Sequence, residues 1–182
     1  MTDLCSIESK GLLTIKQALE KIRNSISPIN GSERVVLKNA LNRILAKPVY
    51  SAINIPPERN SAMDGYAFSS TDITPDQPFS LTLAGTSWAG KPYSEKLLKG
   101  QCIRIFTGAV IPDLADSVIM QENVSKQGNN IIFPANTITK DNIRQVGCDI
   151  AKDARLVTAP KRLSAIDIGL LASAGIYDIA VK

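Results

Sequence analysis

The spacing of apolar residues in this sequence changes at a proline pair, Pro56-Pro57. Before the pair, apolar residues recur at helical spacing, and after it short apolar runs are separated by turn residues, as in β-strands. Helical spacing returns over residues 163–174, where Ser164 and Asp167 make a capping pair. A β-rich stretch enclosed by helix-bearing stretches predicts an α+β fold, with a β-rich domain inserted into a mixed α/β domain and a helix at the N-terminus.

The N-terminal stretch predicts an amphipathic helix over residues 13–26, opened by a capping box of Thr14 and Gln17. The apolar stripe of this helix comprises Ile15, Leu19, Ile22 and Ile26. A short strand is predicted at 35–37. Residues 40–45 predict a second, shorter helix that ends before Pro48.

Strands in the β-rich stretch are predicted at 79–84, 102–106, 117–124 and 131–133. Gly128-Asn129-Asn130 is typical of a hairpin turn between the last two. A final strand is predicted at 176–181, at an edge of the fold. We therefore expect a helical segment at 1–27, a mixed α/β domain made of 28–53 and 138–182, and an inserted β-rich domain at 54–137.

Composition excludes several classes of function. The chain has no histidine, so it cannot use a Ser–His or Cys–His pair of its own, and its three cysteines are far apart. There is no secretory signal and no apolar run of about 20 residues that could span a bilayer. The net charge is +4, and the sequence contains no long run of Lys and Arg of the kind that binds nucleic acid. We expect a cytoplasmic protein that binds neither membrane nor nucleic acid.

Residues 60–67, with the sequence NSAMDGYA, form the first polar cluster. Gly65 allows the backbone to bend sharply beside the carboxylate of Asp64. Asp64 is thus a candidate ligand-binding or metal-ligating residue. An ordinary Asx-type turn before a strand is the more frequent explanation on chemistry alone.

Two further clusters follow. In residues 104–109, RIFTGA, a strand ends at Thr107-Gly108, whose hydroxyl and N–H groups could bind an anion. An ordinary turn after the strand is the simpler alternative.

In residues 142–150, Arg144 and Asp149 could form a structural ion pair. Alternatively, Asp149 joins Asp64 in one acidic site. Two carboxylates and a hydroxyl form an all-oxygen set that suits Mg²⁺.

Other residues near these clusters are weaker candidates. Glu122 follows a strand and could simply face solvent. Trp88 and Tyr93 flank Gly90 and are interpreted as local packing in preference to a base-stacking platform, and Cys102 is interpreted as a core residue.

Together, in this order and spacing, the motifs resemble the molybdopterin molybdenumtransferase family, which includes bacterial MoeA and the E-domain of gephyrin. The resemblance is carried by NSAMDGYA at 60–67, RIFTGAVIP at 104–112 and NIRQVGCDI at 142–150, and it extends over the chain from Ile15 onward. Enzymes of this family are considerably longer. The resemblance therefore implies that this chain corresponds to their N-terminal part.

The resemblance implies an enzyme that inserts molybdenum from molybdate into adenylylated molybdopterin and releases AMP. It also implies that the reaction uses Mg²⁺ or a similar divalent cation. It also implies a homodimer, whose cleft lies between the central domain of one subunit and the β domain of the other, and contacts with other molybdenum cofactor biosynthesis proteins. Because the central domain has no counterpart here, the chain alone is expected to be inactive. The alternative is a non-catalytic dimerisation or scaffolding module, while a small-anion or nucleotide binder rests on Thr107-Gly108 alone.

Site residues are carried over by motif position. The residues that match the family's functional positions are Asp64, Thr107 and Asp149, with Asp64 and Asp149 as the metal ligands. Their motif neighbours, assigned to substrate binding, are Asn60, Ser61, Arg104, Gly108 and Arg144.

The resemblance also generates two structural expectations. In the family the first helix packs toward the central domain, so here its apolar stripe is expected either to find a substitute contact or to be poorly ordered. The second expectation concerns four positions where the family usually has glycine, which are expected to lie in turns: Asn42, Leu114, Asp153 and Pro160.

Overall fold

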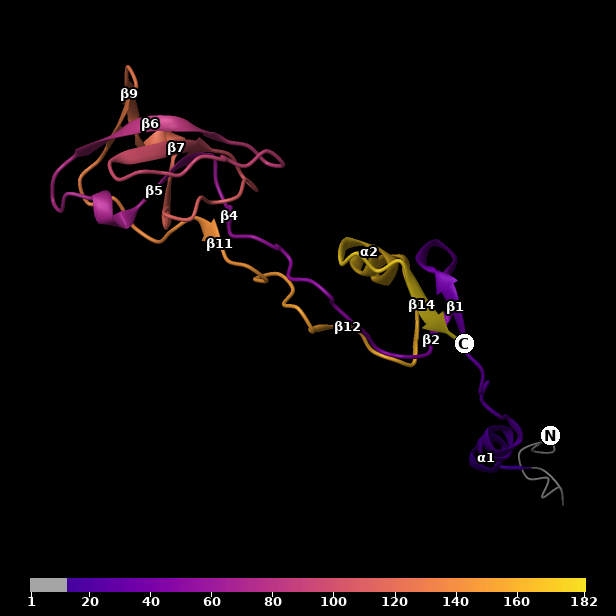
Figure 1. The fold of residues 1–182 in the computed structure, drawn as a ribbon. Helices are drawn as coiled ribbons and strands as arrows, with labels where there is room; N and C mark the ends of the chain where they lie inside the picture. The colour runs from indigo at the N-terminus through magenta and orange to yellow at the C-terminus, as the bar shows by residue number, and fades with distance from the viewer. Residues whose placement is uncertain (1–12) are drawn as a thin grey trace, which may run out of the picture.

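The computed structural model describes residues 13–182, which form two packed units joined by a pair of connecting segments and preceded by a separate helix (Figure 1). From the N-terminus to the first connecting segment, the elements are α1 (Ile15–Ser25), β1 (Glu33–Val36), β2 (Ile44–Leu45) and β3 (Val49–Tyr50). The β-rich unit contains β4 (Asn60–Ser61), β5 (Gly65–Phe68), β6 (Phe79–Ser87), β7 (Gln101–Ile105), β8 (Ser117–Met120), β9 (Ser125–Gln127), β10 (Asn130–Phe133) and β11 (Ile143–Arg144). The chain then returns through β12 (Arg155–Val157), β13 (Lys161–Arg162), α2 (Ala165–Ser173) and β14 (Asp178–Val181).

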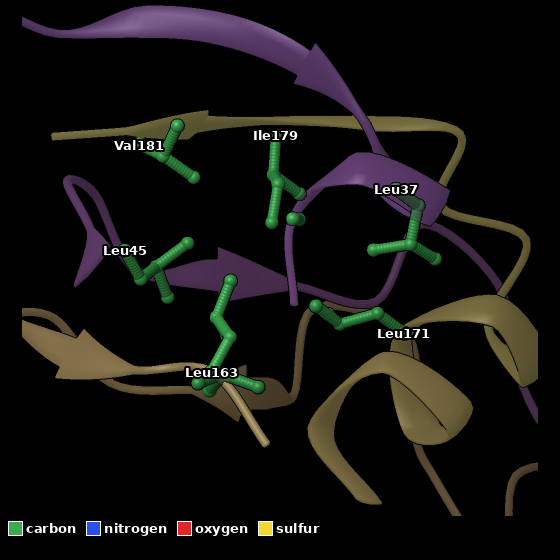
Figure 2. Close-up of a cluster of buried hydrophobic side chains, with 8 residues drawn as sticks. Leu37, Leu45, Leu163, Leu171, Ile179 and Val181 are labelled. Carbon is green, nitrogen blue, oxygen red and sulfur yellow. The ribbon is translucent and has the colours of Figure 1, made fainter. Parts of the chain in front are cut away.

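The smaller unit is an antiparallel sheet in the order β1-β14-β2-β13, with α2 packed against its core. Figure 2 shows Leu45, Leu163, Leu171 and Ile179 pointing toward one another from the sheet and the helix. The last strand, β14, is hydrogen-bonded on both sides, so the prediction of an edge position for it was wrong. Both neighbours of β14, namely β1 and β2, come from before residue 50, and this could not be seen in the local pattern.

The β-rich unit is built on a six-stranded sheet in the order β8-β5-β7-β6-β10-β9, in which β6 and β7 run parallel and the other pairs antiparallel. Each face of the sheet carries its own buried cluster. One face buries Ile103 and Ile105, and the other buries Phe68, Phe79 and Phe133. The ring of Phe133 stacks on Phe79 with centroids 4.8 Å apart and meets the edge of Phe68 at 4.9 Å.

The two connecting segments run side by side between the units (Figure 1). β3 pairs with β12, Ile55 bridges to Ile150, and β4 pairs with β11. The resulting antiparallel ladder brings the residues before Asn60 beside those after Arg144, although the intervening β-rich unit separates them in the sequence. No helix within residues 13–182 is long and apolar enough to cross a bilayer.

Helix α1 forms as predicted, and both hydrogen bonds of its Thr14–Gln17 capping box are present. Its apolar stripe is nevertheless open to solvent, since no residue of α1 is buried within the described chain and Ile15 is 82% exposed. The structure thus contradicts the expectation of a substitute contact or poor order. None of the three buried clusters contains a residue of α1, so the apolar face of α1 has no core to pack against among the described residues.

Two other predictions required correction. The second helix predicted at 40–45 is replaced by a 3₁₀ turn, Leu37–Asn39, followed by β2. Pairing of β2 with β13 and β14, together with the full burial of Leu45, outweighs local helix propensity. The strand predicted at 117–124 ends at Met120 and continues as a 3₁₀ turn, Gln121–Asn123. The hairpin turn at Gly128 is confirmed, but the strand that enters it is β9 and not the strand predicted at 117–124, which pairs with β5.

Two of the four glycine-type positions adopt the left-handed backbone conformation that glycine favours. Asn42 and Asp153 both have φ of 65°. Asn and Asp tolerate this region better than other side chains do, which explains how they occupy these turns. Leu114 and Pro160 are not among the positive-φ residues of the described chain.

The capping carboxylate of α2 provides a test of stability against pH. Asp167 accepts hydrogen bonds from the Ser164 hydroxyl at 2.7 Å and from Lys161 Nζ at 2.6 Å, and the bond from Lys161, more than any other contact, lowers the Asp167 pKa to about 2. We expect Asp167→Ala to lower the free energy of unfolding by about 2 kcal/mol at neutral pH. Because a lowered pKa stabilises the fold only above the ordinary value, this difference should vanish as the pH falls from about 4 to about 2.

Urea denaturation at several pH values measures this effect. Asp113→Ala, in an exposed loop, is the matched control. A wild-type advantage that persists unchanged below pH 2 would contradict the assignment.

Candidate functional site

The side chains of Asp64 and Thr107 meet at one end of the six-stranded sheet. The Thr107 backbone N–H and its hydroxyl both donate to Asp64 Oδ1, each at 2.8 Å. Asp64 immediately precedes β5 and Thr107 lies just beyond β7. Since the two strands are antiparallel with Gly65 opposite Ile105, their pairing brings these residues together. Sequence analysis had placed both residues in a candidate site, and the structure joins them.

These hydrogen bonds set the electrostatics of the pair. The backbone N–H of Thr107, then its hydroxyl, lower the pKa of Asp64, and the positive charge of Arg104 lowers it further. The carboxylate is therefore ionised at neutral pH. Both bonds reach Oδ1, which leaves Oδ2 of the half-buried Asp64 available to a ligand.

Arg104 braces the backbone around Asp64. Its Nη1 donates to the Gly65 carbonyl at 2.7 Å and to the Ile105 carbonyl at 3.1 Å, while Nη2 donates to Gln121 Oε1. The Gln121 backbone N–H donates in turn to the Asp64 carbonyl at 3.1 Å. The Arg104 guanidinium lies over the ring of Phe106, 4.3 Å from its centre.

Glu122 is an acidic neighbour of this network. Gln121 Nε2 donates to Glu122 Oε1 at 2.9 Å, and this bond is the largest cause that lowers the pKa of Glu122, while the charge of Asp64 opposes it. The two carboxylates therefore lie within each other's electrostatic range. Sequence analysis gave Glu122 little weight and missed Gln121, because the 3₁₀ turn that directs both toward Asp64 reads as a continuing strand.

Asn60, Ser61 and Gly108 shape the loop around the pair. Ser61 is fully buried, its carbonyl accepts from the Gly108 N–H at 2.8 Å, and its hydroxyl donates to the Met63 carbonyl. These bonds give Ser61 a structural role. Asn60 Oδ1 is buried without a hydrogen-bond partner among residues 13–182, so it remains able to accept a bond.

Asp149 and Arg144 lie on the returning connecting segment. Arg144 pairs with Asn60 across β11 and β4. The Asp149 N–H donates to the Ile55 carbonyl at 3.0 Å, and Cys148 Sγ lies 3.8 Å from Asp149 Oδ1. Among residues 13–182, no hydrogen bond or ion pair joins Asp149 to Asp64 or Thr107, and Arg144 forms no ion pair with Asp149.

Comparison with known proteins identifies the family to which this fold belongs. The family model for the MoeA N-terminal region (domain I and II) matches residues 13–175. The chain belongs to the MoeA family. The match spans α1, the β-rich unit, the connecting ladder and the smaller unit up to the end of α2, and it stops before β14.

Curated relatives and solved structures agree with the family assignment. A molybdopterin molybdenumtransferase of Haemophilus influenzae is 37% identical over 169 residues, which cover 92% of this chain and 41% of that protein. Gephyrin of Dictyostelium discoideum is 32% identical and is covered over 25% of its length. The molybdopterin biosynthesis MoeA protein of Pyrococcus horikoshii superposes with a TM-score of 0.84 at 31% identity, over 92% of this chain and 45% of that one. The chain thus spans less than half the length of these relatives.

The glycine next to Asp64 provides a test of the site's packing. A Cβ on Gly65 would lie 1.9 Å from the Ile119 carbonyl oxygen, which belongs to the backbone of β8. We expect Gly65→Ala to lower the free energy of unfolding of the β-rich unit by about 3 kcal/mol or more, measured by urea denaturation. Gly169→Ala, with open space around the new methyl group in α2, should instead stabilise by about 0.5–1 kcal/mol. Equal effects of the two substitutions would contradict this packing.

The hydroxyl of Thr107 provides a test of the electrostatics. Thr107→Val keeps the shape of the side chain and removes one of the two bonds to Asp64, so the pKa of Asp64 should rise. It should stay below its ordinary value, because the backbone bond, the larger cause, remains. Carboxyl-detected NMR titration measures the change, and Thr107→Ser, which retains the hydroxyl, should titrate like the wild type. An unchanged pKa in Thr107→Val would show that the hydroxyl does not bond to Asp64.

Proposed function

We propose that this chain is the N-terminal part of an enzyme that inserts molybdenum from molybdate into adenylylated molybdopterin and releases AMP. Family membership and the named activity of the Haemophilus influenzae relative support the reaction. The observation that carries it within this chain is the Asp64–Thr107 pair. An ionised, oriented carboxylate stands at the surface of the β-rich unit, where it can meet a substrate bound by another domain.

The residues present fit a divalent cation that is shared with a substrate. Mg²⁺ usually takes one or two protein carboxylates and fills its remaining positions with waters and substrate phosphates. Asp64 Oδ2 offers one such ligand, Glu122 lies within electrostatic range of Asp64, and Asp149 remains a candidate from the connecting segment. Residues 13–182 contain no group of three acidic or cysteine side chains able to hold a metal by themselves.

When bound, the cation would neutralise the charge on the phosphate ester and on the incoming oxyanion, which otherwise repel each other. The chain's own contribution is orientation. Thr107 fixes Oδ1, so that Oδ2 of Asp64 points to the ligand without a search over rotamers. Arg104 and Gln121 hold the Asp64 backbone, and Gly108 follows at a φ of 81° in the loop that presents the Thr107 N–H.

The proposed site is completed by a second subunit in a homodimer. A surface hollow of about 480 Å³ in the same unit is lined by residues 93–97 and 110–114, and includes neither Asp64 nor Thr107. The pair instead lies open, with Thr107 exposed, so substrate must be enclosed by protein from elsewhere. The central domain of the opposite subunit is the partner that this geometry suits. For that reason the 182-residue chain by itself is proposed to be inactive.

The decisive experiment is Asp64→Asn in the full-length protein. Loss of the carboxylate should reduce molybdate-dependent AMP release about 100-fold or more, since a cation that polarises a phosphoryl oxygen contributes several kcal/mol. Asp76→Asn makes the same chemical change at an exposed turn with a φ of 59° and should retain full activity.

Circular dichroism and urea denaturation check that both variants fold. Wild-type rates of AMP release in a folded Asp64→Asn enzyme would refute the role of Asp64. No molybdate-dependent AMP release by the full-length wild type would favour the scaffolding alternative.

A further inference from the structure

The single tryptophan of the chain lies beside the Asp64–Thr107 pair. Because β6 and β7 run parallel with Ser87 opposite Ile105, Trp88 falls next to Phe106, the residue that precedes Thr107. The two rings stack with centroids 4.2 Å apart and planes within 10°. The Arg104 guanidinium lies 4.3 Å from the centre of the Phe106 ring. Trp88, Phe106 and Arg104 therefore form a stack of two aromatic rings and a guanidinium next to the Asp64–Thr107 pair. Trp88 packs on Phe106 and Tyr93 packs against a buried cluster, as predicted, but half of Trp88 stays exposed.

Trp88 is held rigidly although it is 50% exposed. Its backbone N–H and carbonyl both bond to Lys91, each at 3.0 Å, across a turn in which Gly90 has a φ of 78°. The Ser87 hydroxyl donates to the Val110 carbonyl at 3.1 Å and ties this turn to the loop after Thr107. The Cβ of Ala89 lies 4.0 Å from the position that a Cβ on Gly108 would take, so the two loops lie close to each other.

We propose that Trp88, supported by Phe106, is a stacking surface for the planar fused heterocycle of a phosphate ester whose phosphate reaches the Asp64–Thr107 pair. The proposal rests on the proposed function, whose substrate joins two such heterocycles through phosphate. A ring fixed in advance loses little conformational entropy on binding, and aromatic stacking accepts a purine or a pterin equally. Arg104 makes no ion pair among the described residues, so its charge favours the anionic ester.

Trp88 also reports on its own occupancy, because no other tryptophan contributes to the fluorescence. Titration of the 182-residue chain with AMP, with 6-carboxypterin and with ribose 5-phosphate compares the two heterocycles with a phosphate that lacks a ring. We expect saturable quenching of Trp88 by at least one heterocycle and none by ribose 5-phosphate. The heterocycle that quenches at lower concentration identifies which half of the substrate stacks.

Equilibrium dialysis of the quenching compound then measures affinity in variants. Trp88→Ala should weaken binding about tenfold or more, whereas Trp88→Phe, which keeps an aromatic face, should bind within about threefold of the wild type. Quenching by neither heterocycle, or equal affinity in Trp88→Ala, would overturn the proposal. Trp88 emission that shifts to the blue as protein concentration rises, without a response to heterocycles, would also overturn it and assign the surface to contact between two copies.

The outcome is separable from that of the proposed function. In the full-length protein, Trp88→Ala should raise the KM for the adenylylated substrate about tenfold. An unchanged KM alongside molybdate-dependent AMP release would refute the stacking surface and leave the reaction standing. Heterocycle binding by a full-length protein that releases no AMP would support the stacking surface and refute the proposed reaction.

Discussion

The antiparallel pairing of β5 with β7 is the interaction on which the candidate site depends. This register places Gly65 opposite Ile105, so the residue before one strand and the loop after the other meet at the same end of the sheet. The approach of β8 makes the register strict, because Gly65 leaves no room for a Cβ against Ile119. A slip of one residue would turn the buried residues of β5 to the opposite face. Core packing on both faces therefore fixes the position of the Asp64 carboxylate.

The two packed units have separate hydrophobic cores. The smaller unit buries Leu45, Leu163 and Leu171 between a sheet and α2, while the β-rich unit buries its aromatic cluster without help from that core. The connecting ladder is short of buried side chains but rich in backbone hydrogen bonds, such as those between Ile55 and Ile150. A substitution at the site is therefore expected to affect the β-rich unit first, and this allows folding and chemistry to be measured separately.

Local signals in the sequence predicted those parts of the fold that local interactions determine. Both helices with capping boxes and the hairpin turn at Gly128 were found, because spacing, caps and turn residues specify them. Asp64 and Thr107 were brought into one site by the family resemblance, and their contact depends on the pairing of β5 with β7. The errors arose where distant strands decide. Ile44 and Leu45 read as helix but pair with strands more than a hundred residues away, and β14 read as an edge strand but receives β1 and β2. The roles of Gln121 and Trp88 depend on neighbours that only the folded sheet supplies.

The arrangement at Asp64 explains how a half-buried carboxylate would serve the shared cation proposed above. An acidic group whose pKa was raised to neutrality or above would have to release a proton before it could bind metal, whereas the two Thr107 bonds lower the pKa of Asp64 and favour its charged form. The same bonds occupy one oxygen, so a cation is directed to the other. A single carboxylate holds Mg²⁺ weakly in water, and strong binding then requires the phosphates of the substrate as further ligands. In the function proposed above, the cation would therefore depend on the substrate for further ligands, because Asp64 offers it one oriented oxygen.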